Sequence, residues 1–207
     1  MAFKEHKLEF FEDRIIDLES GSFEVMMSWE LPLMREHAKV ACHNQGDVLE
    51  IGFGMGISAT EIQKLNPKSH TIIEPHPQIL EKLYKWSADK ANVHIIEGEW
   101  YKVLDQLEKY DGIFFDPIHD DDYSKFPDVV SSLIKPGAKV TFWNPSHNSG
   151  NKSCIYAALQ RAMTEKFTGF YAKTSINPPK NSYFSNKEYF VPIVSFPENK
   201  KKSFKER

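Results

Sequence analysis

The sequence predicts an α/β fold in which helices flank a doubly wound, mostly parallel sheet of seven strands. The first observation behind this fold class is an alternation of strand-like and helix-like segments between residues 48 and 143. The second is the continuous apolar run over 112–116, which is typical of a buried parallel strand. The third is a group of glycines after the first strand, where such sheets bind ligands.

Each element follows from apolar periodicity and from the turn residues around it. The predicted strands are 48–51, 70–74, 93–97, 112–116, 139–143, 169–173 and 189–196. The predicted helices are 57–65, 77–87, 101–107, 126–134 and 154–166, and a turn is expected over 135–138. The parallel strands should bring their carboxyl ends to one edge, where the motifs described below also fall.

The chain is expected to have three parts. Residues 1–46 form an N-terminal helical segment, because 8–44 are mostly helical in pattern and Pro32 suits a helix start. Residues 47–197 form the α/β domain, and 198–207 form a basic tail, expected to be loose because chain ends usually are.

Composition narrows the class of protein. Of 207 residues, 41% are hydrophobic and 27% are charged, which is typical of a globular chain. The net charge of −3 argues against nucleic acid as a partner, because no overall positive field attracts it. Cys42 and Cys154 are too few for a disulfide framework or a zinc site, and Cys42 is expected in the core. With no segment of signal or membrane-spanning length, we expect a cytoplasmic protein without a membrane partner.

The strongest ligand-binding signal is the run from Leu49 to Gly56. A strand containing Glu50 leads into Gly52, Gly54 and Gly56, with Phe53 and Met55 between them. Glycines let a backbone turn sharply and approach a ligand without a Cβ clash. The spacing G-x-G-x-G differs from the dinucleotide fingerprint G-x-G-x-x-G. Its place between a strand and a helix nevertheless favours cofactor binding.

Two further strand ends extend this predicted cofactor site. Glu74 ends the second strand about twenty residues after the loop, where an acid can accept both hydroxyls of a ribose. Pro75 follows it, and Gly98 and Glu99 come after the third strand, beside the expected adenine. Trp100 is either a wall of the adenine site or a core residue, since tryptophans are usually largely buried.

Five segments together resemble class I S-adenosylmethionine-dependent methyltransferases, and more closely guanidinoacetate N-methyltransferase. They are V-M-M-S-W-E-L-P-L-M at 25–34, V-L-E-I-G-F-G-M at 48–55, I-I-E at 72–74, G-E-W at 98–100 and D-G-I at 111–113. The resemblance covers about residues 25–116 and is weaker afterwards. It implies a Rossmann-like fold, S-adenosylmethionine as cofactor and methyl transfer to nitrogen.

The resemblance also implies roles for individual residues. Met26 and Met34 would flank the cofactor, with the N-terminal segment folded over the site as a lid. Glu30 and Asp116 would be the catalytic residues, and Asp116 would also lie next to the cofactor. They would hold the guanidino group, because a planar guanidinium matches carboxylates through paired hydrogen bonds. The same two groups would orient the nitrogen and take its proton.

The chain departs from the family after Asp116, and this bears on the acceptor. Asn144 and Pro145 end the fifth strand and are expected to bind substrate, but the family has different residues there for the substrate's carboxylate. We therefore predict N-methylation of a small guanidino or amino compound that resembles guanidinoacetate or arginine. The oligomeric state is open, with a homodimer as one option.

Three alternatives remain. Residues 116–119, D-P-I-H, partly resemble the D-P-P-Y motif of base-modifying enzymes, although His119 replaces the stacking aromatic residue. Methylation of a protein, or a non-catalytic partner subunit that binds the cofactor, would also use the same glycine loop. The run His119 to Asp122 is interpreted as a solvated loop or an acidic rim, because consecutive acids converge poorly on one ion. No metal is predicted.

Overall fold

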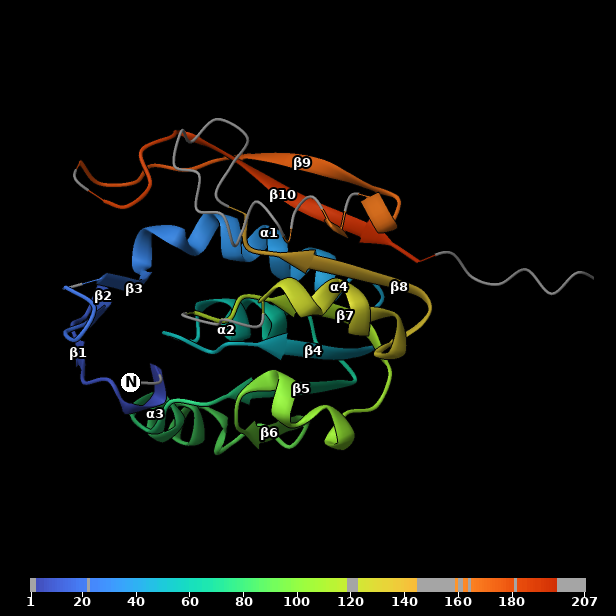
Figure 1. Cartoon of the computed structure of the whole chain (residues 1–207), viewed down its shortest axis with the longest axis horizontal. Helices are drawn as coiled ribbons and strands as arrows, with labels where there is room; N and C mark the ends of the chain where they lie inside the picture. The colour runs from blue at the N-terminus through green and yellow to red at the C-terminus, as the bar shows by residue number, and fades with distance from the viewer. Residues whose placement is uncertain are drawn as a thin grey trace, which may run out of the picture.

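Figure 1 shows the computed structural model of the chain, which is built around one sheet of seven strands. The structure describes residues 3–21, 23–118, 123–144, 159, 162–163, 165–180 and 182–196. The strands of this sheet are β4 Asp47–Ile51, β5 Ser69–Glu74, β6 Val93–Glu97, β7 Tyr110–Phe115, β8 Ile134–Phe142, β9 Gly169–Ser175 and β10 Glu188–Ser195. Their spatial order is β6-β5-β4-β7-β8-β10-β9.

The sheet confirms the predicted architecture. Strands β4 to β8 are parallel, whereas β10 runs antiparallel to both β8 and β9. The chain order reverses on either side of β4, so the fold is doubly wound, with ligand sites expected beyond the carboxyl ends of the strands. Strand β7 is apolar on both faces, and Ile113, Phe114 and Phe115 are all fully buried.

Helices cover both faces of the sheet. Helices α1 Leu31–Ala41 and α2 Ile57–Lys64 pack against each other, α3 is Pro77–Ser87, and α4 is Phe126–Val129. Successive strand residues face opposite layers, so Phe115 packs with Phe126 while Phe114 packs with Leu33 of α1. Cys42 is buried beside α1, as predicted. No helix in the described part of the chain has the length and apolar character needed to cross a membrane.

The N-terminal segment contradicts the helical prediction over residues 8–27. It forms a separate antiparallel sheet of β1 Leu8–Phe10, β2 Arg14–Asp17 and β3 Phe23–Met27. In β2 the buried residues Ile15 and Asp17 alternate with less buried neighbours, which is a period of two rather than 3.6. The helical prediction is correct only for α1, where Pro32 lies in the first turn.

This N-terminal sheet is fixed beside the carboxyl ends of the central strands (Figure 1). The Gln78 side chain at the start of α3 bonds to the backbone N–H and C=O of Leu8, at 2.8 and 3.1 Å. The His76 ring bonds to the His6 carbonyl at 3.0 Å. The segment therefore lies where a lid would lie, and its role as a lid stays a prediction.

Three shorter elements also differ from expectation. Residues 101–107 form two 3₁₀ turns, Trp100–Lys102 and Leu104–Gln106, instead of a helix. The expected helix 126–134 is α4 followed by the 3₁₀ turn Val130–Ser132. The expected turn 135–138 lies within β8, because Gly137 and Ala138 exchange backbone hydrogen bonds with Phe196. Most of the predicted helix 154–166, including Cys154, and the basic tail lie outside the described residues.

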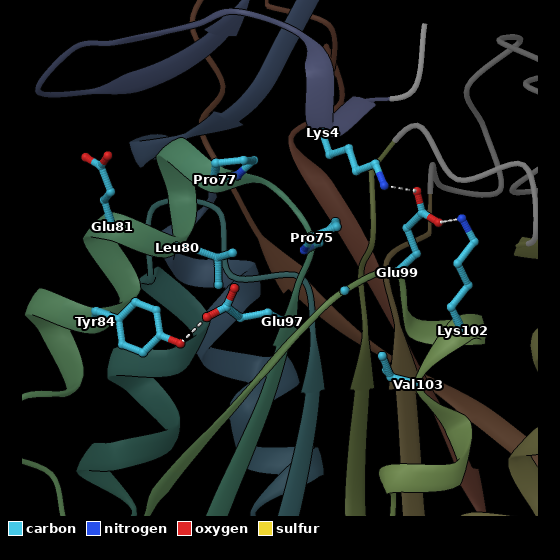
Figure 2. A pocket seen from close by; sticks show the side chains of 11 residues that line it. Lys4, Pro75, Pro77, Leu80, Glu81, Tyr84, Glu97, Glu99, Lys102 and Val103 are labelled. Carbon is cyan, nitrogen blue, oxygen red and sulfur yellow. Dashed lines mark hydrogen bonds and ion pairs between the residues drawn. The ribbon is translucent and has the colours of Figure 1, made fainter.

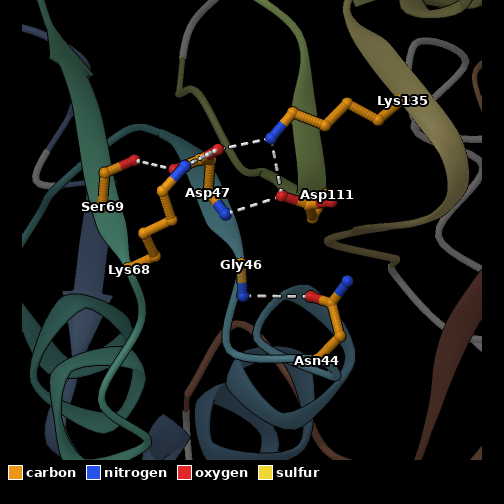
Figure 3. Close-up of polar contacts among 7 residues, drawn as sticks. All are labelled: Asn44, Gly46, Asp47, Lys68, Ser69, Asp111 and Lys135. Carbon is orange, nitrogen blue, oxygen red and sulfur yellow. Dashed lines mark hydrogen bonds and ion pairs between the residues drawn. The ribbon is translucent and has the colours of Figure 1, made fainter.

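A charge cluster joins the amino ends of four central strands (Figure 3). The ammonium group of Lys135 on β8 forms ion pairs with Asp47 of β4 and, at 2.8 Å, with Asp111 of β7. The Ser69 hydroxyl on β5 donates to Asp47 at 2.8 Å, and Lys68 lies 3.1 Å from the same carboxylate. Lys135 is the main cause that lowers the pKa of Asp47 to about 2. This cluster fixes the end of the sheet that faces away from the predicted site.

Candidate active site

The glycine turn after β4 requires glycine for steric reasons. Gly52, Gly54 and Gly56 have φ values of 93°, 54° and 72°, in the region that side chains disfavour. A Cβ atom at Gly52 would lie 2.4 Å from the carbonyl oxygen of Asp116. The turn is therefore pressed against the end of β7, and residue 116 lies next to the predicted cofactor loop.

Met26 of β3 lies directly over this turn. Its sulfur accepts a hydrogen bond from the Met55 N–H at 3.1 Å, and a Cβ at Gly54 would lie 2.5 Å from the same sulfur. Met34, the second methionine predicted to flank the cofactor, is only 1% exposed and packs in the same apolar cluster as Met26. The structure thus brings Met26 to the loop and places Met34 in the core behind it.

Glu50 and Phe53, predicted as cofactor contacts, lie beneath the turn and support it. Glu50 is fully buried, its Oε1 accepts from the Ser58 hydroxyl on α2, and its Oε2 lies 2.9 Å from His70 Nε2 on β5. Phe53 is 3% exposed, and its ring packs edge-on against Trp86 at 5.4 Å. The two side chains thus support the loop from below, and direct contact of either residue with the cofactor stays a prediction.

Glu74 has the position that a ribose-binding acid needs. It ends β5 beside the glycine turn, where its two oxygens accept the N–H groups of Phe53 at 3.0 Å and His76 at 2.8 Å. Burial raises its pKa to about 7, and these backbone donors oppose the rise. A carboxylate offers about four lone-pair sites, so hydroxyl donors can still be accepted. A glycine-rich turn beside this acid fits the nucleoside part of S-adenosylmethionine.

A cavity of about 590 Å³ opens between α3 and the segment that follows β6 (Figure 2). Pro75, Gly98 and Glu99, three of the predicted cofactor residues, line it. Sequence reasoning missed Leu80 of α3 and Val103, which line the same cavity, because ordinary apolar residues give no signal of a ligand site. Lys4 and Lys102 both form ion pairs with Glu99 at its rim.

Trp100 does not line this cavity. It is 3% exposed and packs edge-on against Phe115 at 5.3 Å and Phe126 at 5.9 Å. The core alternative given for Trp100 is therefore confirmed, and its contact with an adenine stays a prediction. Its 3₁₀ turn directs the ring into the layer formed by α4 rather than toward the strand ends.

Glu30 lies in a 3₁₀ turn, Ser28–Glu30, that connects β3 to α1. Its side chain is buried at 3% exposure, and one oxygen accepts the Met27 N–H at 2.8 Å. Burial raises the pKa of Glu30 to about 8. Local sequence explains its place, because Pro32 lies in the first turn of α1 and the acid falls at the helix N-terminus.

Asp116, partly buried after β7, completes the predicted acceptor pair. Its backbone N–H donates to Ile51 at 2.9 Å. Burial raises its pKa well above the ordinary value, and the negative charges of Glu30 and Glu50 raise it further. Among the described groups, the charges acting on Glu30 and Asp116 are all negative. Glu30 and Asp116 are thus close enough to interact, and each disfavours the charged form of the other.

Aromatic residues surround Glu30. Tyr183 lowers the pKa of Glu30, against the rise that burial causes, and its ring centroid lies 5.6 Å from that of Trp29. The Trp143 ring lies 6.1 Å from Tyr183, and Phe184 stacks on Trp29 at 6.1 Å. Sequence reasoning missed Tyr183, since it lies between β9 and β10, far along the chain from Glu30 and outside any motif.

Asn144, predicted to bind substrate, is fully buried just after β8. Its N–H donates to the Tyr189 hydroxyl at 2.7 Å, and that hydroxyl lies 3.1 Å from Nε2 of His37. Burial lowers the pKa of His37 to about 3, so this histidine is neutral. Within the described chain the Oδ1 of Asn144 has no hydrogen-bond partner. Pro145 and the run His119 to Asp122 lie outside the described residues.

Comparison with known sequences gives a consistent set of relatives. The family model for guanidinoacetate N-methyltransferase matches residues 3–170. Protein arginine N-methyltransferase 2 of Candida glabrata is 38% identical over 215 residues, covering 92% of this chain and 51% of that protein. Its namesake from Saccharomyces cerevisiae is 32% identical, with 92% and 52% covered. The chain therefore spans about half the length of these curated relatives.

Solved structures with the same fold are more distant in sequence. The N-methyltransferase NodS of Bradyrhizobium japonicum, in complex with S-adenosyl-L-homocysteine, has a TM-score of 0.59 at 15% identity, covering 82% of this chain and 88% of that one. Fibrillarin of Aeropyrum pernix, with bound S-adenosyl-L-methionine, has a TM-score of 0.57 at 11% identity, covering 94% and 84%. At these identities the likeness concerns the fold, and the predicted Rossmann-like class is confirmed.

Proposed function

This chain belongs to the guanidinoacetate N-methyltransferase family of S-adenosylmethionine-dependent N-methyltransferases, and we propose that it methylates a guanidino nitrogen of arginine in a protein. The family resemblance predicted from the sequence is confirmed by this membership, and the names of the relatives support N-methyl transfer as the activity. The identity of the acceptor is our proposal.

The acceptor proposed here differs from the small compound predicted from the sequence. The matched relatives are named as protein arginine N-methyltransferases, which favours an arginine side chain over free guanidinoacetate. The chemical group to be methylated is the same in both cases. What changes is that the guanidino group would be part of a polypeptide, without a free carboxylate beside it.

The observation that carries the proposal is the pair Glu30 and Asp116. Asp116 lies next to the glycine turn and Glu30 is close enough to interact with it. Both have raised pKa values, and the charges that act on them are negative. Leaving two acids in this state costs stability unless a cation binds there. A guanidinium suits the pair, because it stays charged and offers donors in a fixed planar arrangement.

The remaining residues have roles that follow from their positions. S-adenosylmethionine, when bound, supplies a methyl group on a positively charged sulfur. Met26 and the glycine turn at 52–56 would hold it, and Glu74 would accept hydrogen bonds from its ribose. Glu30 and Asp116 would orient the guanidino nitrogen and accept the proton that it loses when its new bond to carbon forms. A carboxyl group with a pKa near 8 is well matched to that proton transfer at neutral pH.

A methyl-transfer assay tests this proposal. The protein is incubated with labelled S-adenosylmethionine and one of four acceptors: an arginine-containing peptide, the same peptide with lysine, free arginine, or guanidinoacetate. We expect label in the arginine peptide and none in the lysine peptide. Label in guanidinoacetate alone would overturn the protein acceptor and restore the small compound. Cofactor binding without label in any acceptor would overturn methyl transfer and support a partner subunit.

A further inference from the structure

We propose that Tyr183 determines the specificity of the acceptor site: its hydroxyl orients the Glu30 carboxylate, and its ring, beside Trp29, forms a flat wall on which a guanidinium stacks. This inference rests on the proposed function, because it concerns the same site. It adds a residue that neither the family motifs nor the sequence pattern indicated.

The aromatic residues next to Glu30 support the stacking wall. Trp29 directly precedes Glu30 in the chain, and Tyr183 lowers the pKa of Glu30, opposite to the effect of burial. The ring of Tyr183 lies 5.6 Å from Trp29 and 6.1 Å from Trp143, at interplanar angles of 44° and 49°. Glu30 therefore lies at the base of an aromatic corner. Tyr183 is 38% exposed, so one side of the corner is open to an incoming side chain.

The backbone of this segment is tied to the strand that covers the glycine turn. Glu24 of β3 accepts hydrogen bonds at 3.1 Å from the Ser182 hydroxyl and from the Tyr183 N–H. Two residues further along β3, Met26 bonds to the glycine turn through its sulfur. One short strand thus contacts both the cofactor loop and Tyr183, which fixes the aromatic corner relative to the expected methyl donor.

The hydroxyl of Tyr183 also favours the charged form of Glu30. Burial raises the pKa of Glu30, and the hydrogen bonds from Met27 and Tyr183 oppose this rise. The other titratable groups around it are Glu24 on β3, Asp116 after β7 and Tyr189 on β10, none of which is a cation. Removing the hydroxyl would raise the pKa of Glu30 further. More of the carboxyl group would then be protonated at neutral pH, and a neutral carboxyl group pairs poorly with a cation.

The ring contributes to the choice between cations. A guanidinium is planar and weakly hydrated, so it stacks well on aromatic faces, whereas an ammonium is compact and strongly hydrated. Cation–π contacts are worth roughly 0.5–2 kcal/mol, depending on how far the site is desolvated. Loss of the ring should therefore weaken arginine binding more than lysine binding, which a general loss of folding would not do.

The experiment compares Tyr183→Phe and Tyr183→Leu with a control, Tyr171→Phe on the edge strand β9. Binding of an arginine peptide and of the matching lysine peptide is measured by calorimetry, with S-adenosylhomocysteine present. The titration of the Glu30 carboxyl carbon is followed separately by NMR, and thermal unfolding checks each variant. Neither main measurement requires turnover. An inactive wild type would therefore contradict the proposed function, whereas the role of Tyr183 is tested by binding and titration.

For Tyr183→Phe we expect Glu30 to titrate at higher pH, and arginine affinity to fall about tenfold near neutral pH and to recover at alkaline pH. For Tyr183→Leu we expect about a tenfold loss for arginine at every pH, with a smaller loss for lysine. An unchanged Glu30 titration in the Phe variant would overturn the role of the hydroxyl. Equal losses for the two peptides in the Leu variant, or a wild type that does not distinguish them, would overturn the role of the ring.

Discussion

The two ends of the central sheet contain acidic residues in opposite states. At the amino end, Asp47 and Asp111 share the ammonium group of Lys135, and the pKa of Asp47 is lowered to about 2. At the carboxyl end, burial raises the pKa of Glu74 to about 7 and that of Glu30 to about 8. Asp47 and Asp111 are thus paired with a cation, whereas no cation acts on Glu30 or Glu74 among the described residues.

This difference distinguishes acids that stabilise the fold from acids kept for a ligand. A carboxyl group whose pKa is lowered by folding stabilises the native state above its unfolded pKa, and this stabilisation is lost as the pH falls through the folded value. A carboxyl group whose pKa is raised has the opposite effect: the folded protein holds a proton that the unfolded chain releases, so stability falls as the pH rises between the two values. For Glu30 that window runs from 4.5 to about 8.

The largest effect is expected from Glu30→Gln. Glutamine can still accept the Met27 N–H, but it lacks the charge that pairs with a guanidinium and takes its proton. We expect methyl transfer to the arginine peptide to fall by about a hundredfold or more, measured with labelled cofactor. The control is Glu36→Gln on the outer side of α1, where the carboxylate pairs with Lys39. Near wild-type rates in Glu30→Gln would remove this residue from the reaction.

The next effect concerns cofactor affinity. Glu74→Gln keeps acceptor oxygen but loses the charge that ribose hydroxyls would bind, and charge-assisted hydrogen bonds contribute about 1.5–3 kcal/mol. We expect S-adenosylhomocysteine to bind roughly 10- to 100-fold more weakly in calorimetry. Affinity within twofold of the wild type would contradict the assignment of Glu74 to the ribose.

We also expect that a substitution which abolishes methyl transfer stabilises the fold. Without ligand, Glu30→Gln removes a carboxyl group that burial disfavours in its charged form. We expect its free energy of unfolding at pH 8 to exceed that of the wild type by about 1–3 kcal/mol, and the difference to vanish near pH 4. Denaturant unfolding at the two pH values measures this. A variant that is less stable than the wild type at pH 8 would show that Glu30 stabilises the fold.

The smallest effect is expected at the amino end. Asp47→Asn removes the partner of Lys135 and Lys68, which are 33% and 74% exposed, so solvent screens much of the interaction. We expect a loss of about 1 kcal/mol at pH 7 that disappears as the pH falls toward 2, with methyl transfer unchanged. Loss of activity without loss of stability would mean that the two ends of the sheet are not independent.

The alternation from β4 to β8 could be predicted because each element lies between clear turn residues and has its own apolar period. The N-terminal strands could not be predicted in the same way. Only the 3₁₀ turn Ser28–Glu30 separates β3 from α1, and the pairing of β3 with β2 depends on contacts that local periodicity does not record. Strands β1 and β2 are only three and four residues long, too short for a strong alternating signal.

In the candidate site, too, local sequence predicted some residues, while others depend on tertiary contacts. Glu30, Glu74 and Asp116 lie in or next to motifs, and the structure brings all three to the carboxyl end of the sheet. Glu50 and Trp100 also belong to motifs, but their side chains turn into the core, because His70 and Phe126 offer them partners there. Tyr183 lies between β9 and β10 and acts on the pKa of Glu30, and only the folded chain brings the two residues together.

The most direct test of cation binding by Glu30 and Asp116 measures how many protons are released when an arginine peptide binds. Calorimetry on protein saturated with S-adenosylhomocysteine is repeated at pH 7 in buffers of different ionisation enthalpy. The pKa of Glu30 is about 8, and that of Asp116 is well above its ordinary value. Both groups must lose their protons to pair with a cation, so we predict that binding releases protons and strengthens as the pH rises. Binding without proton release, at an affinity independent of pH, would contradict it.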